Sequence, residues 1–424
     1  MSLPHRRALA VLVWPHAGED EVAAVIASVA DWDGLVDAAL REGVGPLLAE
    51  RLAAGSSAGA AGSGPSASES SICATLQDPA GSPQAGVAAA VGAHVPAAVL
   101  ERLAHVRRDA ARRAVSHASV LGRVASSLAA GGIRFVALKG PALSQTLYGD
   151  LSLRTFADLD LLVLPADVRA ARSRLLAGGF RDSSPWAEQA LSRGLPPDGE
   201  LCLQAPDGRP FVDLHWSIFG GFGGPGFPVG RVLAGARSAD VLGRAVLVPG
   251  ARDQLLLSVL HGSRHYWDTL EARLAVALPA RGVPAPEWET VVADAGRLGC
   301  RRRLASGVAV ALETFAQPLP EPLRRELAAD PVARGYIAFV RVRTRTPSAL
   351  ANPPLREHLA MTWWRARCED RPAAAAAQLA LRLLHPGPGD WAAVRLPPWL
   401  DCGYWLLRPL RLGLKYAAAM RRPG

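Results

Sequence analysis

The sequence predicts an α/β fold of the α+β kind, in which a small mixed β-sheet core is flanked by helical regions. Between residues 133 and 248, short apolar runs typical of buried strands alternate with segments of helical spacing. Before and after that stretch, apolar residues recur mainly at the three- and four-residue spacing of amphipathic helices. With 424 residues, of which 50% are hydrophobic, the chain can bury at least one sizeable core.

Changes in composition divide the chain into four regions. Residues 1–54 carry apolar stripes and form an N-terminal helical region. Residues 55–95 are rich in Gly, Ala and Ser, which predicts a flexible linker. Residues 96–250 form the core, and a long basic helix from about Ala97 to Ala130 delivers the chain to its first strand. Residues 251–424 form a C-terminal helical region.

The elements of the core follow from local patterns. Pro suits the first position of a helix and Gly its end, so the residues between Pro141 and Gly149 predict a short helix directly after a strand. Apolar runs and their turn residues place the other elements. The predicted strands are 133–138, 156–164, a segment around Asp213 and 241–248, the helices are 141–148, 167–177 and 252–270, and residues 220–230 form a loop that borders the site.

Asp158 and Asp160 stand two residues apart in a predicted buried strand. Side chains alternate along a strand, so both carboxylates point the same way. Two such charges in an apolar segment repel each other unless a cation lies between them, and magnesium prefers oxygen ligands of this kind. Asp213, on a later strand, is a candidate third ligand. The alternative is a solvated strand edge on which both aspartates face water.

Lys139 and Gly140 form a turn between a predicted strand and a helix. The free N–H groups at the start of a helix and the positive end of its dipole attract phosphate. The chain uses arginine for almost all its cations, and Lys139 is one of only two lysines. We expect Lys139, Gly140 and the guanidinium of Arg154 to bind a triphosphate, with Ser144 one turn further along.

Taken together, these motifs resemble the uncharacterised nucleotidyltransferase family, which is related to the polymerase-beta-type superfamily. The likeness extends from about residue 32 to about residue 319. It implies catalytic and metal-binding roles for Asp158, Asp160 and Asp213, with Mg²⁺ or Mn²⁺ as the cofactor. It also implies transfer of a nucleoside monophosphate from a nucleoside triphosphate such as ATP to an acceptor hydroxyl, with release of pyrophosphate. The motifs that carry it are Leu138-Lys139-Gly140, Tyr148-Gly149-Asp150, Arg154, Asp158-Leu159-Asp160 and Val212-Asp213-Leu214-His215-Trp216.

Three histidines are further candidates for contact with the acceptor or with a metal-bound carboxylate. His215 shares a strand face with Asp213. His261 and His265 are four residues apart on the helix predicted over 252–270. Such a pair can bind zinc, but no Glu follows His261 and no third ligand stands at a convincing position, so no metal besides magnesium or manganese is expected. Packing in the core is the alternative for all three.

The net charge and the cysteines limit which partners and which cellular compartment we expect. The net charge of +9 keeps a nucleic-acid acceptor such as tRNA open, but aromatics make up only 6% and do not alternate with basic residues, so nucleic acid is not favoured. The five cysteines are scattered and form no metal or disulfide pattern. No cleavage site follows the short apolar run near the N-terminus, and we expect a cytoplasmic bacterial protein.

The acceptor stays open. A small molecule, a sugar, a peptide or a protein hydroxyl all fit the motifs, and an inactive protein of this fold that serves as a scaffold in a biosynthetic assembly is a separate alternative. The basic tail over 399–422 has apolar stretches too short to span a bilayer. It predicts either a helix docked on the body or peripheral contact with an anionic membrane.

Overall fold

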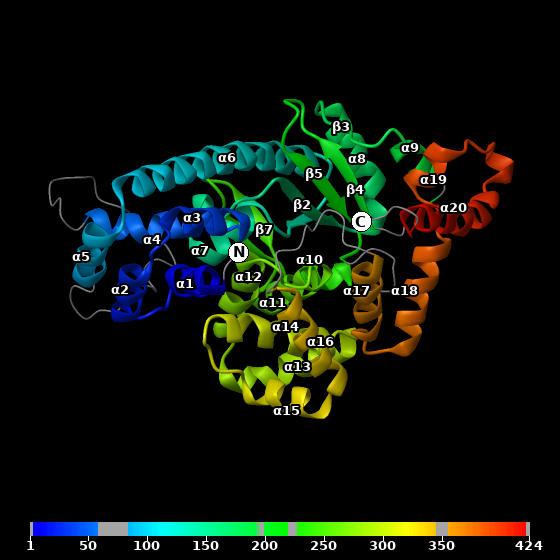
Figure 1. The fold of residues 1–424 in the computed structure, drawn as a ribbon. Coiled ribbons are helices and arrows are strands. Elements are labelled where there is room, and N and C mark those ends of the chain that lie inside the picture. Colours follow the sequence, from blue (N-terminus) through cyan, green and yellow to red (C-terminus); the bar gives the residue numbers. More distant parts are fainter. Residues whose placement is uncertain are drawn as a thin grey trace.

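The computed structural model describes residues 3–57, 84–192, 194, 199–218, 227–344 and 355–420. It confirms the predicted architecture, because a mixed sheet from the middle of the chain is flanked by helices from both ends (Figure 1). The helices are α1 (Leu3–Val13), α2 (Glu19–Ser28), α3 (Trp32–Arg41), α4 (Gly45–Ser57), α5 (Gln84–His94), α6 (Ala97–Ala129), α7 (Pro141–Tyr148), α8 (Val168–Ala177), α9 (Ala187–Ser192), α10 (Val229–Ala234), α11 (Ala251–Arg264), α12 (Leu270–Arg281), α13 (Trp288–Leu298), α14 (Arg301–Thr314), α15 (Glu321–Ala329), α16 (Pro331–Arg343), α17 (Leu355–Arg367), α18 (Pro372–Leu384), α19 (Pro388–Ala393) and α20 (Gly403–Met420).

The main sheet has five strands in the order β1-β2-β5-β4-β3. Strands β2 and β5 run parallel, and the other neighbours are antiparallel. A separate two-stranded sheet pairs β6 with β7. The strands are β1 (Phe135–Ala137), β2 (Asp158–Val163), β3 (Arg181–Asp182), β4 (Glu200–Gln204), β5 (Phe211–His215), β6 (Arg237–Asp240) and β7 (Ala245–Val248).

The two faces of β2 have different surroundings. Leu159, Leu161 and Val163 are buried in one cluster with residues of α6 and α8. Leu162 belongs to a second cluster, which contains residues of α10 and α11. Because alternate side chains share a face, Asp158 and Asp160 lie on the same side as Leu162. The carboxylates therefore face the helices of the C-terminal region rather than α6 and α8.

The N-terminal helices do not have a core of their own. Buried residues of α1 to α4, such as Leu9, Ile26 and Leu48, belong to the same cluster as Leu260 and Val308 of the C-terminal helices. The long helix α6 packs on α4 near its start and on α8 near its end, and it spans the upper side of the molecule in Figure 1. The N-terminal and C-terminal helices thus form one body beside the sheet, and the boundaries at 54 and 250 stay predictions.

The linker predicted over residues 55–95 is only partly described. Residues 58–83 lie outside the described part of the chain. Residues 84–94 form α5, so the prediction of a linker is wrong for them. Val87 and Val91 are buried against the N-terminal helices, and Val95, four residues further, continues the stripe. This short apolar stripe is enough to dock a helix that is otherwise rich in Ala and Gly.

The C-terminal tail forms α20, which docks on α19. Arg408 and Arg411 both bind Asp390, whose side chain is 1% exposed, and Tyr404 is buried. Leu406, Leu410 and Leu414 are exposed, and contact of this stripe with a membrane stays a prediction. In the described residues, no single helix has the length and apolar character of a membrane span, although residues 86–94 and 97–129, bent by 114°, pass that test as a pair.

Candidate functional site

The pairing of β2 with β5 brings two of the three predicted carboxylates, Asp160 and Asp213, together. Asp160 is the direct partner of Asp213 across the two parallel strands, and Leu162 is the partner of His215. Asp158 stands two residues before Asp160 on the same face. The prediction that Asp213 would come from a strand next to the Asp158/Asp160 pair is confirmed. The metal and catalytic roles of the three residues stay predictions.

The structure also provides a ligand set for a cation. Asp160, Asp213 and His215 each offer a ligand atom, and these atoms lie within 4.8 Å of one another. Asp160 is 3% exposed, and its Oδ2 atom is buried without a hydrogen-bond partner. A buried carboxylate oxygen without a partner is costly unless a cation compensates it. The carboxylates of Asp160 and Asp213 therefore fit a divalent ion.

His215 supports this carboxylate. Its Nε2 lies 3.0 Å from Oδ1 of Asp160, and because a carboxylate only accepts, the imidazole donates there. Its Nδ1 lies 3.6 Å from Oε2 of Glu200 on β4. An imidazole between two carboxylates orients Asp160 and is poorly placed to bind a metal through Nε2. Glu200 was not predicted, because a single Glu in a strand-like segment gives no signal.

The turn before α7 holds the only described lysine side chain close to the same carboxylate. Lys139 Nζ lies 2.8 Å from Oδ1 of Asp160. Gly140 has φ 66° and ψ −144° and precedes Pro141, the first residue of α7. A Cβ on Gly140 would lie 3.2 Å from Leu159 and 3.3 Å from the carbonyl oxygen of Asp158. The predicted strand, turn and helix are therefore present, and the turn lies against β2.

Ser144 does not face this turn. Its side chain is fully buried, and its hydroxyl donates to the carbonyl oxygens of Asp150 and Leu151, at 2.8 and 3.3 Å. The hydroxyl therefore anchors the loop after α7. The nucleotide contact predicted for Ser144 finds no support in this geometry.

Replacing Gly140 tests how much the site depends on this turn. We expect Gly140→Ala to lower the free energy of unfolding by about 1–3 kcal/mol, because the backbone conformation is strained for any side chain with a Cβ. Urea unfolding measures the change. Gly92→Ala is the control, since Gly92 lies in α5 with nothing near its Cβ position and should be neutral or slightly stabilised. Equal stability of Gly140→Ala and wild type would contradict the expectation.

The surroundings of the three carboxylates shift their pKa values in different directions. Burial raises the pKa of Asp158, and the charge of Asp160 raises it further. Burial also raises the pKa of Asp213, even though Cys202 donates a hydrogen bond to it. Burial opposes ionisation of Asp160 too, but Lys139 and His215 outweigh it and hold its pKa well below the usual range. The charge of Asp160 is thus compensated, whereas the charges of Asp158 and Asp213 are not. This arrangement favours an added cation.

Arg154 is held by a residue that the sequence analysis missed. The arginine is 9% exposed, and its Nε pairs with Oε1 of Glu271 at the start of α12. Its Nη1 is buried without a hydrogen-bond partner. The predicted triphosphate contact of Arg154 stays a prediction, and Glu271 orients the guanidinium. A Glu at the first turn of a helix, 117 positions from its partner, carries no signal that pattern analysis can use.

The two histidines near residue 261 are neighbours, but the helix predicted over 252–270 is interrupted. Helix α11 ends at Arg264, and Tyr266 and Trp267 have φ of 60° and 44°. The prediction of one continuous helix is therefore wrong. The ring centroids of His261 and His265 are still 5.3 Å apart. In the described part of the chain, neither belongs to a group of three metal ligands.

His261 gives the protein a pH dependence of known sign. Burial first, and then the charge of Lys139, lowers the pKa of His261 well below its usual value. An unfolded chain takes up a proton near pH 6.5. The stability that depends on neutral His261 is complete above that pH and is lost as the pH falls toward the folded pKa.

We therefore expect His261→Gln to flatten the loss of stability below pH 6.5. In the wild type each such histidine contributes up to about 1.4 kcal/mol per pH unit to this loss. Metal-free urea unfolding at several pH values between 7 and 5 measures the slope. The control variant is His94→Gln on α5, which removes an imidazole that is exposed rather than buried. An unchanged slope in His261→Gln would show that the imidazole does not titrate in this way.

A narrow pocket of about 60 Å³ lies between the sheet and helices α11 and α12. Side chains of the site and of both helices line it, among them Lys139, Arg154, Asp160, His215, Gln254, Ser258, His261, Arg264 and Glu271. The pocket joins the predicted turn, Arg154 and the buried carboxylate in one space. His261 is the predicted histidine that closes it from the α11 side.

Comparison with known proteins supports one assignment. A family model described as an uncharacterised nucleotidyltransferase matches residues 28–316. This range contains all the candidate site residues as well as α3 and α14. No curated protein matches the chain.

Proposed function

Since the chain belongs to this uncharacterised nucleotidyltransferase family, we propose that it transfers a nucleoside monophosphate from a nucleoside triphosphate to an acceptor hydroxyl in a magnesium-dependent reaction. The observation that carries the proposal is the pair of Asp160 and Asp213 on adjacent parallel strands, beside a pocket that also contains Lys139 and Arg154. In a protein that served only as a scaffold, nothing would offset the cost of burying the Oδ2 atom of Asp160 without a hydrogen-bond partner.

Asp158, Asp160 and Asp213 would hold the divalent ion, magnesium or manganese. Such an ion, when bound, would neutralise charge on the triphosphate and polarise the reacting phosphoryl group. Asp160 is the central ligand in this proposal, because it is the most buried of the three and is oriented by His215. A residue that forms a hydrogen bond with a ligating carboxylate, as His215 does here, fixes the direction in which that carboxylate points.

The triphosphate has three partners in the proposal. Lys139 lies at the turn, the free N–H groups at the start of α7 provide the positive end of a helix dipole, and Arg154 contributes a guanidinium oriented by Glu271. In the reaction the acceptor oxygen forms a bond to the α-phosphorus and the bond to the bridging oxygen of pyrophosphate breaks. Asp213, whose raised pKa suits a proton acceptor, takes the hydroxyl proton.

Calorimetry on the full chain tests this function. The protein is titrated with each of the four common triphosphates, with and without Mg²⁺. We expect at least one triphosphate to bind in a magnesium-dependent manner. In a separate assay with labelled triphosphate, we expect label on the α-phosphate to appear in the acceptor, whereas label on the γ-phosphate should not. Absence of metal-dependent binding would favour the scaffold alternative. Retention on a polyanionic resin that falls steeply with salt, without triphosphate binding, would favour a nucleic-acid binder.

A further inference from the structure

A second pocket adjoins the first one at the junction of α11 and α12. It has a volume of about 400 Å³. The two pockets share part of their lining, which comprises His261, Gly262, Arg264, Glu271 and Ala272. Beyond this shared wall, the second pocket is bounded by residues of α16 and α17. A molecule bound in it can therefore present one of its groups to the pocket that contains Asp160.

The second pocket is rich in arginine. Arg264, Arg343 and Arg365 line it, together with Asp268 and Glu271. Glu271 is engaged by Arg154. Arg343 is paired with Glu357 of α17. Glu357 itself does not line the pocket. Of the three arginines, Arg264 and Arg365 are thus the ones available to a bound molecule, and the carboxylate of Asp268 lies in the same lining.

These two arginines have hydrogen-bonding capacity to spare. Arg264 is exposed, lines both pockets, and forms no ion pair or side-chain hydrogen bond with any described residue. Arg365 lies over the ring of Tyr266, with its Cζ 5.2 Å from the centroid. One of its Nη atoms donates to the carbonyl oxygen of Arg264, whereas its Nε is buried without a partner. Planar guanidinium groups with free donors bind phosphate and carboxylate groups well.

The floor of this pocket is rigid. Tyr266 and Trp267 are consecutive residues with positive φ, which is a strained conformation that must be held by its surroundings. A Cβ on Gly262 would lie 2.3 Å from Trp267 Cδ1, so only glycine fits between the two pockets. The strained turn is thus locked from the side of α11.

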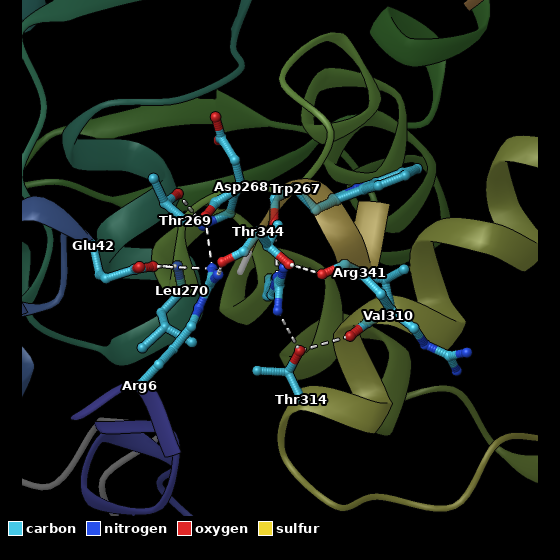
Figure 2. Close-up of polar contacts among 12 residues, drawn as sticks. Arg6, Glu42, Trp267, Asp268, Thr269, Leu270, Val310, Thr314, Arg341 and Thr344 are labelled. Atoms are coloured by element: carbon cyan, nitrogen blue, oxygen red, sulfur yellow. Dashed lines mark hydrogen bonds and ion pairs between the residues drawn. The ribbon is translucent and has the colours of Figure 1, made fainter. Parts of the chain in front are cut away.

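Buried polar contacts lock it from the other side, as Figure 2 shows. Arg6 of α1 donates to the carbonyl oxygens of Asp268 and Thr344, at 2.6 and 2.8 Å. Glu42 accepts from the N–H of Leu270 at 2.7 Å. Arg273 donates to the carbonyl oxygen of Trp267 at 2.7 Å. The N-terminal helices thereby fix the turn that carries Tyr266, and a site held in this way is preorganised for its ligand.

We propose that the second pocket binds the acceptor through an anionic group, a phosphate or a carboxylate, held by Arg264 and Arg365. This inference rests on the proposed nucleotidyl transfer, since the acceptor must reach the first pocket with its hydroxyl. A phosphate or a carboxylate accepts hydrogen bonds from both guanidinium groups and also balances their charge, which a neutral group does not. The remaining volume accommodates the rest of the molecule beyond the anionic group.

Modification of arginine by phenylglyoxal, mapped by mass spectrometry, tests the site with inorganic phosphate as the probe. At ten times its dissociation constant, phosphate should slow modification of Arg264 about tenfold. Arg237 on β6 is exposed and lines neither pocket, so its rate should not change. Modification of Arg264 that is insensitive to phosphate overturns the proposal.

A second arm separates an acceptor from the triphosphate itself. Arg365 is the readout of this arm, because it lines only the second pocket. With saturating Mg-ATP bound, phosphate should still protect Arg365. Complete protection of Arg365 by Mg-ATP alone would show that the triphosphate occupies the second pocket, and would overturn the assignment to an acceptor.

A third arm uses Asp160→Asn. Phosphate protection should persist in this variant even where metal-dependent nucleotide binding is lost, so that failure of the proposed function and failure of the acceptor site give different results. Loss of phosphate protection in the folded Asp160→Asn variant would show that the two pockets are not separate sites.

Discussion

Replacing Asp160 with asparagine is expected to reduce nucleotidyl transfer by about 10²- to 10³-fold, which is the scale of losing one well-placed electrostatic contact in an active site. Asp160 accepts from both Lys139 and His215 and lies opposite Asp213. Asparagine keeps the shape of the side chain but removes its negative charge. The remaining charges then no longer favour a divalent ion, because Lys139 loses its counter-ion at the same place.

The measurement is the initial rate of transfer of α-phosphate label at saturating magnesium. Urea unfolding of the same variant shows whether it is folded, and we expect a cost of about 1–3 kcal/mol from the lost charge-assisted hydrogen bonds. Asp33→Asn is the matched control, since Asp33 lies on α3, its side chain is 84% exposed and it pairs with Arg102 at the surface. A folded Asp160→Asn protein with the transfer rate of the wild type would remove Asp160 from the mechanism.

The carboxylate pair could be located from sequence because its position depends on local periodicity. Alternation along β2 fixes which residues share a face with Asp160. The apolar residues on either side of Asp160, Leu159 and Leu161, are buried on the opposite face, and this leaves one direction for the carboxylates. The same argument applies to Asp213 between Val212 and Leu214. Gly140 and Pro141 likewise identify the turn and the first residue of α7 by their backbone preferences.

The partners that complete the site could not be predicted in this way. Glu271 and Glu200 reach the site through tertiary packing, and each is a single acidic residue in an ordinary segment. The break after Arg264 is equally hidden, because no Gly or Pro occurs between residues 263 and 270. Contacts from Arg6 and Arg273 hold the chain in its strained turn there. Long-range contacts thus override a local helical pattern, and the second pocket exists because of them.

Removing Glu271 should be the most damaging change to stability near the site. We expect Glu271→Ala to lower the free energy of unfolding by about 3–5 kcal/mol, because it leaves the guanidinium of Arg154 buried without its counter-ion. The two side chains are 9% and 17% exposed, so water cannot replace the lost partner fully. Urea unfolding measures the change. Glu313→Ala provides the comparison, since its pair with Arg341 is about half exposed and should contribute less than about 1 kcal/mol.

A double variant separates the structural part of this pair from its part in catalysis. Arg154→Met combined with Glu271→Leu removes both charges and fills the space with apolar groups, and such replacements of buried ion pairs are often neutral for stability. We therefore expect the double variant to regain most of the stability that Glu271→Ala loses. If Arg154 binds the triphosphate, the stable double variant should still bind Mg-NTP more weakly than the wild type in calorimetry. Wild-type affinity in that protein would mean that the ion pair only holds α12 against the loop after α7, and that Lys139 and the turn at Gly140 bind the phosphates without it.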